Sequence, residues 1–72
     1  MTITLQHLLN WFSYHEPEDG QVEKYNSIRA AALNLAEVIV DNTPASADQT
    51  AAVRLVRQAA MQANAAIACK GQ

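Results

Sequence analysis

The stretch that decides the fold spans residues 18–42, with the sequence EDGQVEKYNSIRAAALNLAEVIVDN. Its apolar side chains recur every three or four positions, which places them on one stripe of an α-helix. The stripe consists of Val22, Tyr25, Ile28, Ala32, Leu35 and Ile39. Leu33, Ala36 and Val40 widen it to more than one apolar face. The pattern therefore predicts a long helix over about residues 18–42 that needs partners on more than one side. Gly20 weakens the first turn, so the alternative is a regular helix that begins only near Gln21.

A second long helix is predicted over about residues 47–69. Pro44 holds Thr43 extended and so separates the two helices. Ser46 and Gln49 have the spacing of a capping box at the start of the second helix, and Gly71 is a natural stop. The apolar stripe of this helix consists of Ala52, Val56, Ala60, Ala63 and Ile67, with Val53 and Leu55 beside it. Since the link is short, the two helices should form an antiparallel hairpin.

The N-terminal part is predicted to form a shorter helix over about residues 3–12, capped by Thr2 or Thr4. A turn-rich connector follows over residues 13–20, and Pro17 in it favours an extended Glu16. The fold class is therefore all-α: one domain of residues 1–72, with a short helix followed by a hairpin of two long helices.

Composition predicts that this hairpin assembles with copies of itself. Half of the residues are hydrophobic, but fourteen of these are alanines and only four residues are aromatic. Alanine buries little apolar area, so one chain of this length has a thin core. The single cysteine, Cys69, excludes a disulfide within the chain and indicates a reducing compartment. Self-association is the remaining source of stability, and a homo-oligomer is expected.

Net charge, the length of the apolar runs and the spacing of the histidines and the cysteine argue against several functional classes. The net charge of −2 argues against a protein that binds DNA or RNA duplexes. No apolar run approaches the ~20 residues of a membrane span, and the N-terminus lacks the features of a signal peptide. His7, His15 and Cys69 do not have the spacing of a zinc site. The chain is expected to be a cytoplasmic protein without a metal, a cofactor or a membrane partner.

Catalysis is also disfavoured, because the sequence contains no nucleophile–base pair, glycine-rich phosphate loop or HExxH motif. A binding site is a better prediction. Tyr14 and His15 lie in the connector, and Lys24 and Arg29 follow early in the first long helix. An aromatic ring beside cations is the combination that holds a nucleotide, since the ring stacks on the base and the cation meets the phosphate. The alternative is a core-edge Tyr14 and an Arg29 paired with an acid.

Asn64 is unusual because it interrupts a run of alanines. A polar amide there predicts either a buried hydrogen bond that fixes the register between helices or a ligand contact. Arg54 and Arg57 are expected on the solvated face, with Asp48 and Glu37 among their possible partners.

Three motifs in order carry a resemblance to a known family. They are FSYHEP at residues 12–17, KYNSIR at residues 24–29 and AMQANAAIA at residues 60–68. In this combination the chain resembles the phage anti-CBASS cyclic-nucleotide sponges, which share a hairpin domain with anti-Thoeris sponges. The resemblance covers the chain from Phe12 to about Lys70.

The resemblance implies a helical homo-hexamer that acts in the host bacterial cytoplasm. Such proteins bind cyclic dinucleotides such as 3′,3′-cyclic GMP–AMP, and in some members cyclic trinucleotides, without cleaving them. The host CBASS effectors then stay inactive because the free signal is removed. An enzyme is not expected, and the alternative is a structural or protein-interaction hairpin without a nucleotide ligand.

The resemblance also implies site residues. Tyr14 matches the tyrosine that stacks on the bases, and Arg29, or else Lys24, matches the cation that meets the phosphates. Whether His15 contacts the ligand or caps the next helix is left open. A separate trinucleotide pocket would involve Asn64 and Lys70, although this chain has Cys69-Lys70 where the family pattern has an arginine.

Overall fold

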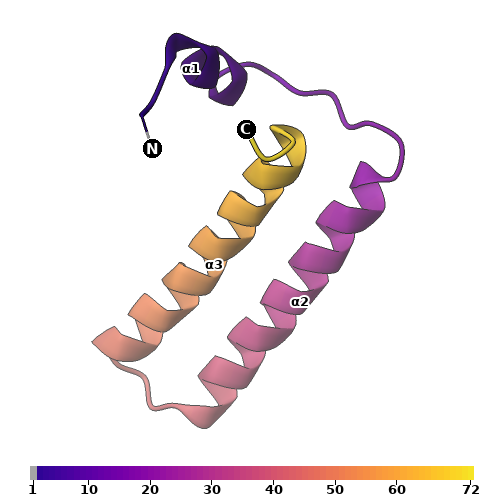
Figure 1. The fold of residues 1–72 in the computed structure, drawn as a ribbon. Helices are drawn as coiled ribbons and strands as arrows, with labels where there is room; N and C mark the ends of the chain where they lie inside the picture. The colour runs from indigo at the N-terminus through magenta and orange to yellow at the C-terminus, as the bar shows by residue number, and fades with distance from the viewer. Residues whose placement is uncertain (1) are drawn as a thin grey trace.

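The computed structural model describes residues 2–72, which fold into three helices (Figure 1). Helix α1 spans Leu5–Trp11, α2 spans Gln21–Asn42 and α3 spans Ala47–Ala68. Helices α2 and α3 form an antiparallel hairpin, and α1 lies across its open end beside the C-terminus (Figure 1). The expected all-α architecture with a hairpin is therefore confirmed. None of the three helices combines the length and the apolar character that a membrane span requires.

Local chemistry sets the starts of the helices. At α1, the Thr4 hydroxyl accepts the backbone N–H of His7 while the His7 ring accepts the backbone N–H of Thr4, so histidine completes a capping box. At α3, the Ser46 hydroxyl accepts the N–H of Gln49, as expected. The Gln49 side chain, however, donates to the carbonyl oxygen of Thr43, so only half of the predicted box forms.

Helix α2 begins at Gln21, the later of the two predicted starts, and not at residue 18. Gly20 precedes it with φ 83°, a left-handed conformation that glycine adopts without a steric cost. This conformation separates residues 18–19 from the helix. The Glu18 carbonyl instead accepts the N–H of Gln21 in a turn.

The two long helices pack through small side chains, and no residue between 2 and 72 is fully buried. The half-buried positions of α2 are Gln21, Tyr25, Ile28, Ala32, Ala36 and Ile39. Val22 and Leu35, which the sequence placed on the inner stripe, are about half exposed. At 100° per residue, Val22 and Leu35 fall on opposite edges of the inward arc, and Gln21 and Ala36 lie within it.

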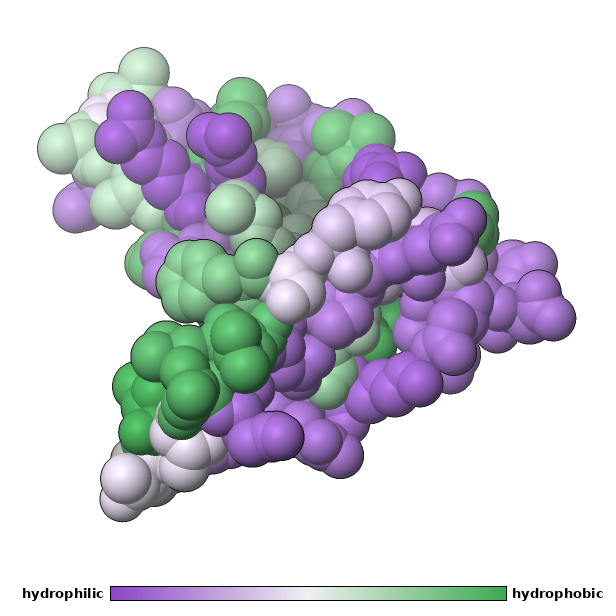
Figure 2. Space-filling model, turned by 90° about the horizontal axis from the view of Figure 1, so that it is seen from above, coloured by the Kyte–Doolittle hydropathy of each residue, from purple (hydrophilic) through white to green (hydrophobic). Residues whose placement is uncertain are grey.

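Large apolar side chains cover both outer faces of the hairpin. Helical geometry places five exposed residues on the side of the hairpin away from Arg29 and Arg57, and we call this surface the alanine face: Leu35, Val38, Leu55, Ala59 and Ala66. Leu33 and Met61 lie exposed on the other face. Apolar atoms also gather in a patch at one corner of the surface seen from above (Figure 2). A single chain therefore leaves most of its apolar surface in water, which favours the predicted self-association.

Helix α3 ends in a Schellman motif whose left-handed residue is Lys70. The N–H of Gly71 donates to the Ala66 carbonyl at 2.9 Å, and the N–H of Lys70 donates to the Ile67 carbonyl at 3.2 Å. The predicted stop at Gly71 is thus one residue late, since Lys70 already has φ 55°. A side chain in this conformation is strained, because its Cβ approaches the following carbonyl oxygen.

Replacing Lys70 with glycine should therefore relieve strain at the end of α3. We expect Lys70→Gly to be more stable than Lys70→Ala by about 1 kcal/mol, because both variants lose the lysine charge and only glycine removes the Cβ. Thermal unfolding at matched concentration measures the difference, with a shift of about 4–8 °C per kcal/mol in a domain of this size. Equal midpoints for the two variants would show that this turn stores no strain.

Candidate functional site

One groove on the hairpin combines cations with an apolar floor, and we call it the arginine groove. It has a volume of about 310 Å³ and is open to solvent. Helix α2 contributes Arg29, Ala32, Leu33 and Ala36, and α3 contributes Val53, Val56, Arg57, Ala60, Met61 and Asn64. Both helices therefore supply one arginine each to the same groove, and the surface between these arginines is apolar. Pockets for small ligands are mostly of this kind, with a few polar groups set in an apolar lining.

The arginines of the groove carry uncompensated positive charge. The guanidinium of Arg29 donates to the Asn26 side-chain oxygen at 3.0 Å and meets no carboxylate. Between residues 2 and 72 the only ion pair joins Lys70 and Glu18. An acid-paired Arg29 is therefore not found within one chain, and Asp48 and Glu37, the possible partners, do not pair with Arg57 there.

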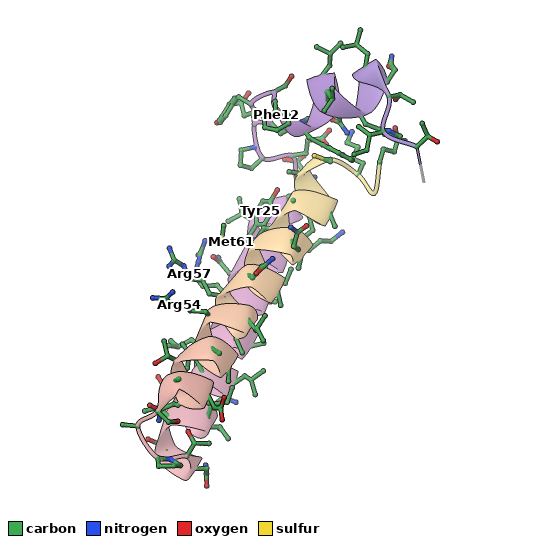
Figure 3. The ribbon with its side chains drawn as sticks, turned by 90° about the vertical axis from the view of Figure 1, so that its left-hand side faces the viewer. Phe12, Tyr25, Arg54, Arg57 and Met61 are labelled. Carbon is green, nitrogen blue, oxygen red and sulfur yellow. The ribbon has the colours of Figure 1, made fainter. Side chains whose placement is uncertain are left out.

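Arg54 lies one turn before Arg57 on α3, and both guanidinium groups project from the same edge of the hairpin (Figure 3). Arg54 lines a neighbouring hollow with Arg57, Gln58, Met61 and Gln62, but it does not line the arginine groove. No acidic residue lines either depression. The local potential is therefore positive although the chain as a whole carries −2.

Asn64 lines the same groove with one side-chain atom left unsatisfied. Its Oδ1 is shielded from solvent and has no hydrogen-bond partner among the described residues. This oxygen therefore makes no register-fixing bond between α2 and α3 within one chain. Neither predicted role of Asn64 is thus observed for this oxygen within one chain, and the ligand contact stays a prediction.

Replacing Asn64 with leucine, which has a similar shape, should stabilise the hairpin. A buried acceptor without a partner costs about 1–3 kcal/mol, and leucine removes that cost. We expect chemical denaturation of Asn64→Leu to show an increase of about 1 kcal/mol in the free energy of unfolding. Asn64→Ala is the control, because it removes the amide but leaves a void. A leucine variant less stable than the wild type would mean that the amide is satisfied in solution.

The connector presents Tyr14 to solvent. Tyr14 is 86% exposed and Phe12 is 85% exposed, so neither ring packs against its own chain. Phe12 projects from the α1 end of the molecule, away from the arginines on the hairpin (Figure 3). The alternative of a core-edge Tyr14 therefore does not hold within one chain. The ring is available to a ligand or to another copy.

The ring of His15 has a hydrogen-bond partner within its own chain. Its Nε2 donates to the Asn10 carbonyl oxygen at 2.6 Å, and the Cys69 sulfur lies 3.9 Å away. Asn10 in turn donates to the Cys69 carbonyl, and the Trp11 indole donates to the Gln72 carbonyl at 2.9 Å. His15 thus helps to fix α1 and the connector to the end of α3. It does not cap α2, which has no side-chain cap.

The two candidate cations of α2, Lys24 and Arg29, do not line the same depression. Lys24 lies in a different depression from Arg29, with Glu23, Ser27, Ile28 and Ile67. Five residues along a helix correspond to a rotation of about 140° around its axis, so the two side chains flank opposite edges of the inner stripe. Of these two cations, Arg29 alone lines the arginine groove.

Asn64 and Lys70 are separated as well. Lys70 lines a hollow with His15 and Cys69, and its ammonium group lies 3.0 Å from the Glu18 carboxylate. Asn64 shares its groove with Arg29 instead. The residue that sequence reasoning missed is Arg57, which lies seven positions before Asn64 and so on the same face of α3. This seven-residue spacing from Asn64 is the feature of the sequence that could have identified Arg57.

A model of the Acb2/Tad1 hairpin domain matches residues 5–68, which is most of the chain. Searches among curated proteins and among solved structures found no match. The matched segment includes all three helices, the connector and the arginine groove.

Proposed function

Because the chain belongs to the Acb2/Tad1 hairpin-domain family, a family of anti-CBASS and anti-Thoeris sponges, we propose that it sequesters cyclic oligonucleotide immune signals. Its ligands are cyclic dinucleotides such as 3′,3′-cyclic GMP–AMP, with cyclic trinucleotides as a second class. Binding without cleavage lowers the free signal in the host bacterial cytoplasm, and the CBASS effectors stay inactive. The resemblance inferred from the sequence motifs is the same family, and it is confirmed by the match.

The observation that carries this proposal is the arginine groove in a chain of this family. A cyclic dinucleotide has flat bases and anionic phosphates, and the groove offers an apolar surface beside guanidinium groups. Tyr14 does not line the groove of its own chain, and its exposed ring is proposed to stack on the base from a neighbouring copy. Lys24, His15 and Lys70 remain further candidates, although His15 and Lys70 have partners within the chain.

Assembly is part of the proposal. The groove of one chain, at about 310 Å³, lies at the lower end of the range of 300–1,000 Å³ for ligand pockets. A ligand with two bases and two phosphates suits a twofold interface, where two copies each contribute Tyr14 and Arg29. The exposed apolar surface supports a homo-oligomer, and the family resemblance implies a hexamer.

Titration calorimetry with 3′,3′-cyclic GMP–AMP tests the function, with the assembly mass measured on the same sample. We expect saturable binding at about one ligand per two chains. Denaturing the complex should then release the unchanged dinucleotide, since no turnover is proposed. Linear or hydrolysed product would identify an enzyme instead.

A second candidate function is protein docking, which the exposed apolar faces favour. Absence of heat with cyclic dinucleotides, cyclic trinucleotides and ADP-ribose-type signals would support this candidate, if a stoichiometric protein partner is also recovered. Binding of ADP-ribose-type signals alone would keep the sponge mechanism but move it from CBASS to Thoeris.

A further inference from the structure

We propose that Arg57 is a second phosphate-binding residue, and that Arg29 and Arg57 grip a ligand phosphate from opposite walls of the arginine groove. This inference rests on the proposed function and specifies how one site recognises its ligand. The two residues belong to different helices, and both line the same groove. The apolar walls beside these arginines leave room for the base that carries the phosphate.

The charges of the chain support this assignment. The chain has seven acidic residues, and none of them lines the groove. Neither Arg29 nor Arg57 has a carboxylate within ion-pair distance in the described part of the chain. Arg29 is held by the Asn26 amide, a neutral acceptor that positions the guanidinium without neutralising it. Two guanidinium groups without counterions are suited to a ligand that brings negative charge of its own.

The planar guanidinium group of arginine restricts the chemical class of the ligand further. Guanidinium is a planar fork that binds two phosphate oxygens at once, which an ammonium group does not do. A base can lie on the apolar walls formed by Leu33, Val56 and Met61. The occupant is therefore a nucleotide with its base on these walls and its phosphate between the two arginines.

Arg54 provides a matched control on the same helix. It is the same residue type one turn away, it projects from the same edge and it lines only the neighbouring hollow (Figure 3). Removing its charge changes the net charge of the chain as much as removing that of Arg57. A difference between the two variants therefore reports position in the groove and not overall electrostatics.

The test compares Arg57→Gln, Arg57→Lys and Arg54→Gln in calorimetric titrations with 3′,3′-cyclic GMP–AMP at two salt concentrations. Loss of a charge-assisted hydrogen bond should weaken binding by Arg57→Gln roughly 10- to 150-fold and make its salt dependence shallower. Arg57→Lys should keep the salt dependence with intermediate affinity. Arg54→Gln should bind within about twofold of the wild type, and all variants should keep the wild-type assembly mass.

The outcomes separate this inference from the proposed function. Wild-type affinity in Arg57→Gln, with normal binding by the unmodified protein, would overturn the role of Arg57 and leave the sponge intact. Equal losses in Arg54→Gln and Arg57→Gln would assign the effect to general charge and also overturn it. A fall in assembly mass in Arg57→Gln would make Arg57 an interface residue. No binding by the unmodified protein would overturn both proposals.

Discussion

Replacing Tyr14 with alanine should abolish most of the affinity for cyclic dinucleotides. Stacking of one base on an aromatic ring contributes about 1–3 kcal/mol, which corresponds to roughly a 5- to 150-fold change in the dissociation constant. If the ligand lies on a twofold interface, two copies of Tyr14 are lost together and the effects multiply. The ring is 86% exposed and packs against nothing in its own chain, so the variant should fold normally. Titration calorimetry measures the loss.

Tyr14→Phe is the matched control, because it keeps the ring and removes only the hydroxyl. It should retain affinity within a few-fold of the wild type. Phe12→Ala removes a neighbouring ring that is equally exposed, and it should have little effect on ligand affinity. Strong loss in Phe12→Ala with normal binding by Tyr14→Ala would exchange the roles of the two rings.

Replacing Leu55 with aspartate should break the assembly. Leu55 is 65% exposed on the alanine face, opposite the arginine groove, and we expect this face to be covered by another copy. An unpaired carboxylate buried at such an interface costs about 3–5 kcal/mol per copy, because it loses its hydration without gaining a partner. Light scattering at micromolar concentration should show a lower mass, and the thermal midpoint should fall.

Asn34→Asp is the control for Leu55→Asp, because it adds the same charge at an exposed position of α2 away from the arginines. It should keep the wild-type mass. An unchanged mass in Leu55→Asp would show that the alanine face is free, and the interface would then have to lie on the remaining apolar surface. A wild-type protein that stays monomeric at all concentrations would contradict self-association altogether.

The sequence was sufficient to predict the hairpin because apolar periodicity extends over more than twenty residues in each long helix. It was less reliable at the ends of helices, where single residues decide. Gly20 adopts a left-handed conformation that excludes residues 18–19 from α2, and Lys70 takes a position at which glycine was expected. These backbone conformations depend on the hydrogen bonds of neighbouring turns, and periodicity carries no information about them.

The candidate site was predicted only in part. Arg29 and Asn64 were both singled out, but the sequence did not place them in one groove, because the relative rotation of two packed helices depends on their contacts. Arg57 was assigned to the solvated face for the same reason. The separation of Lys24 from Arg29, in contrast, follows from helical geometry alone and could have been worked out in advance.

The attachment of α1 to the hairpin has a consequence for how a ligand is captured. Hydrogen bonds from Asn10 and Trp11 hold this seven-residue helix at the end of α3, and one from His15 joins the connector to α1, while the leucines of α1 remain exposed. With so little apolar burial, local opening of α1 costs far less than unfolding of the hairpin. Tyr14 therefore lies in a connector that detaches together with α1 while the groove between α2 and α3 stays folded. Ordering α1 and the connector over a ligand costs chain entropy. A cross-link that fixes α1 in that position would therefore raise affinity without adding a contact.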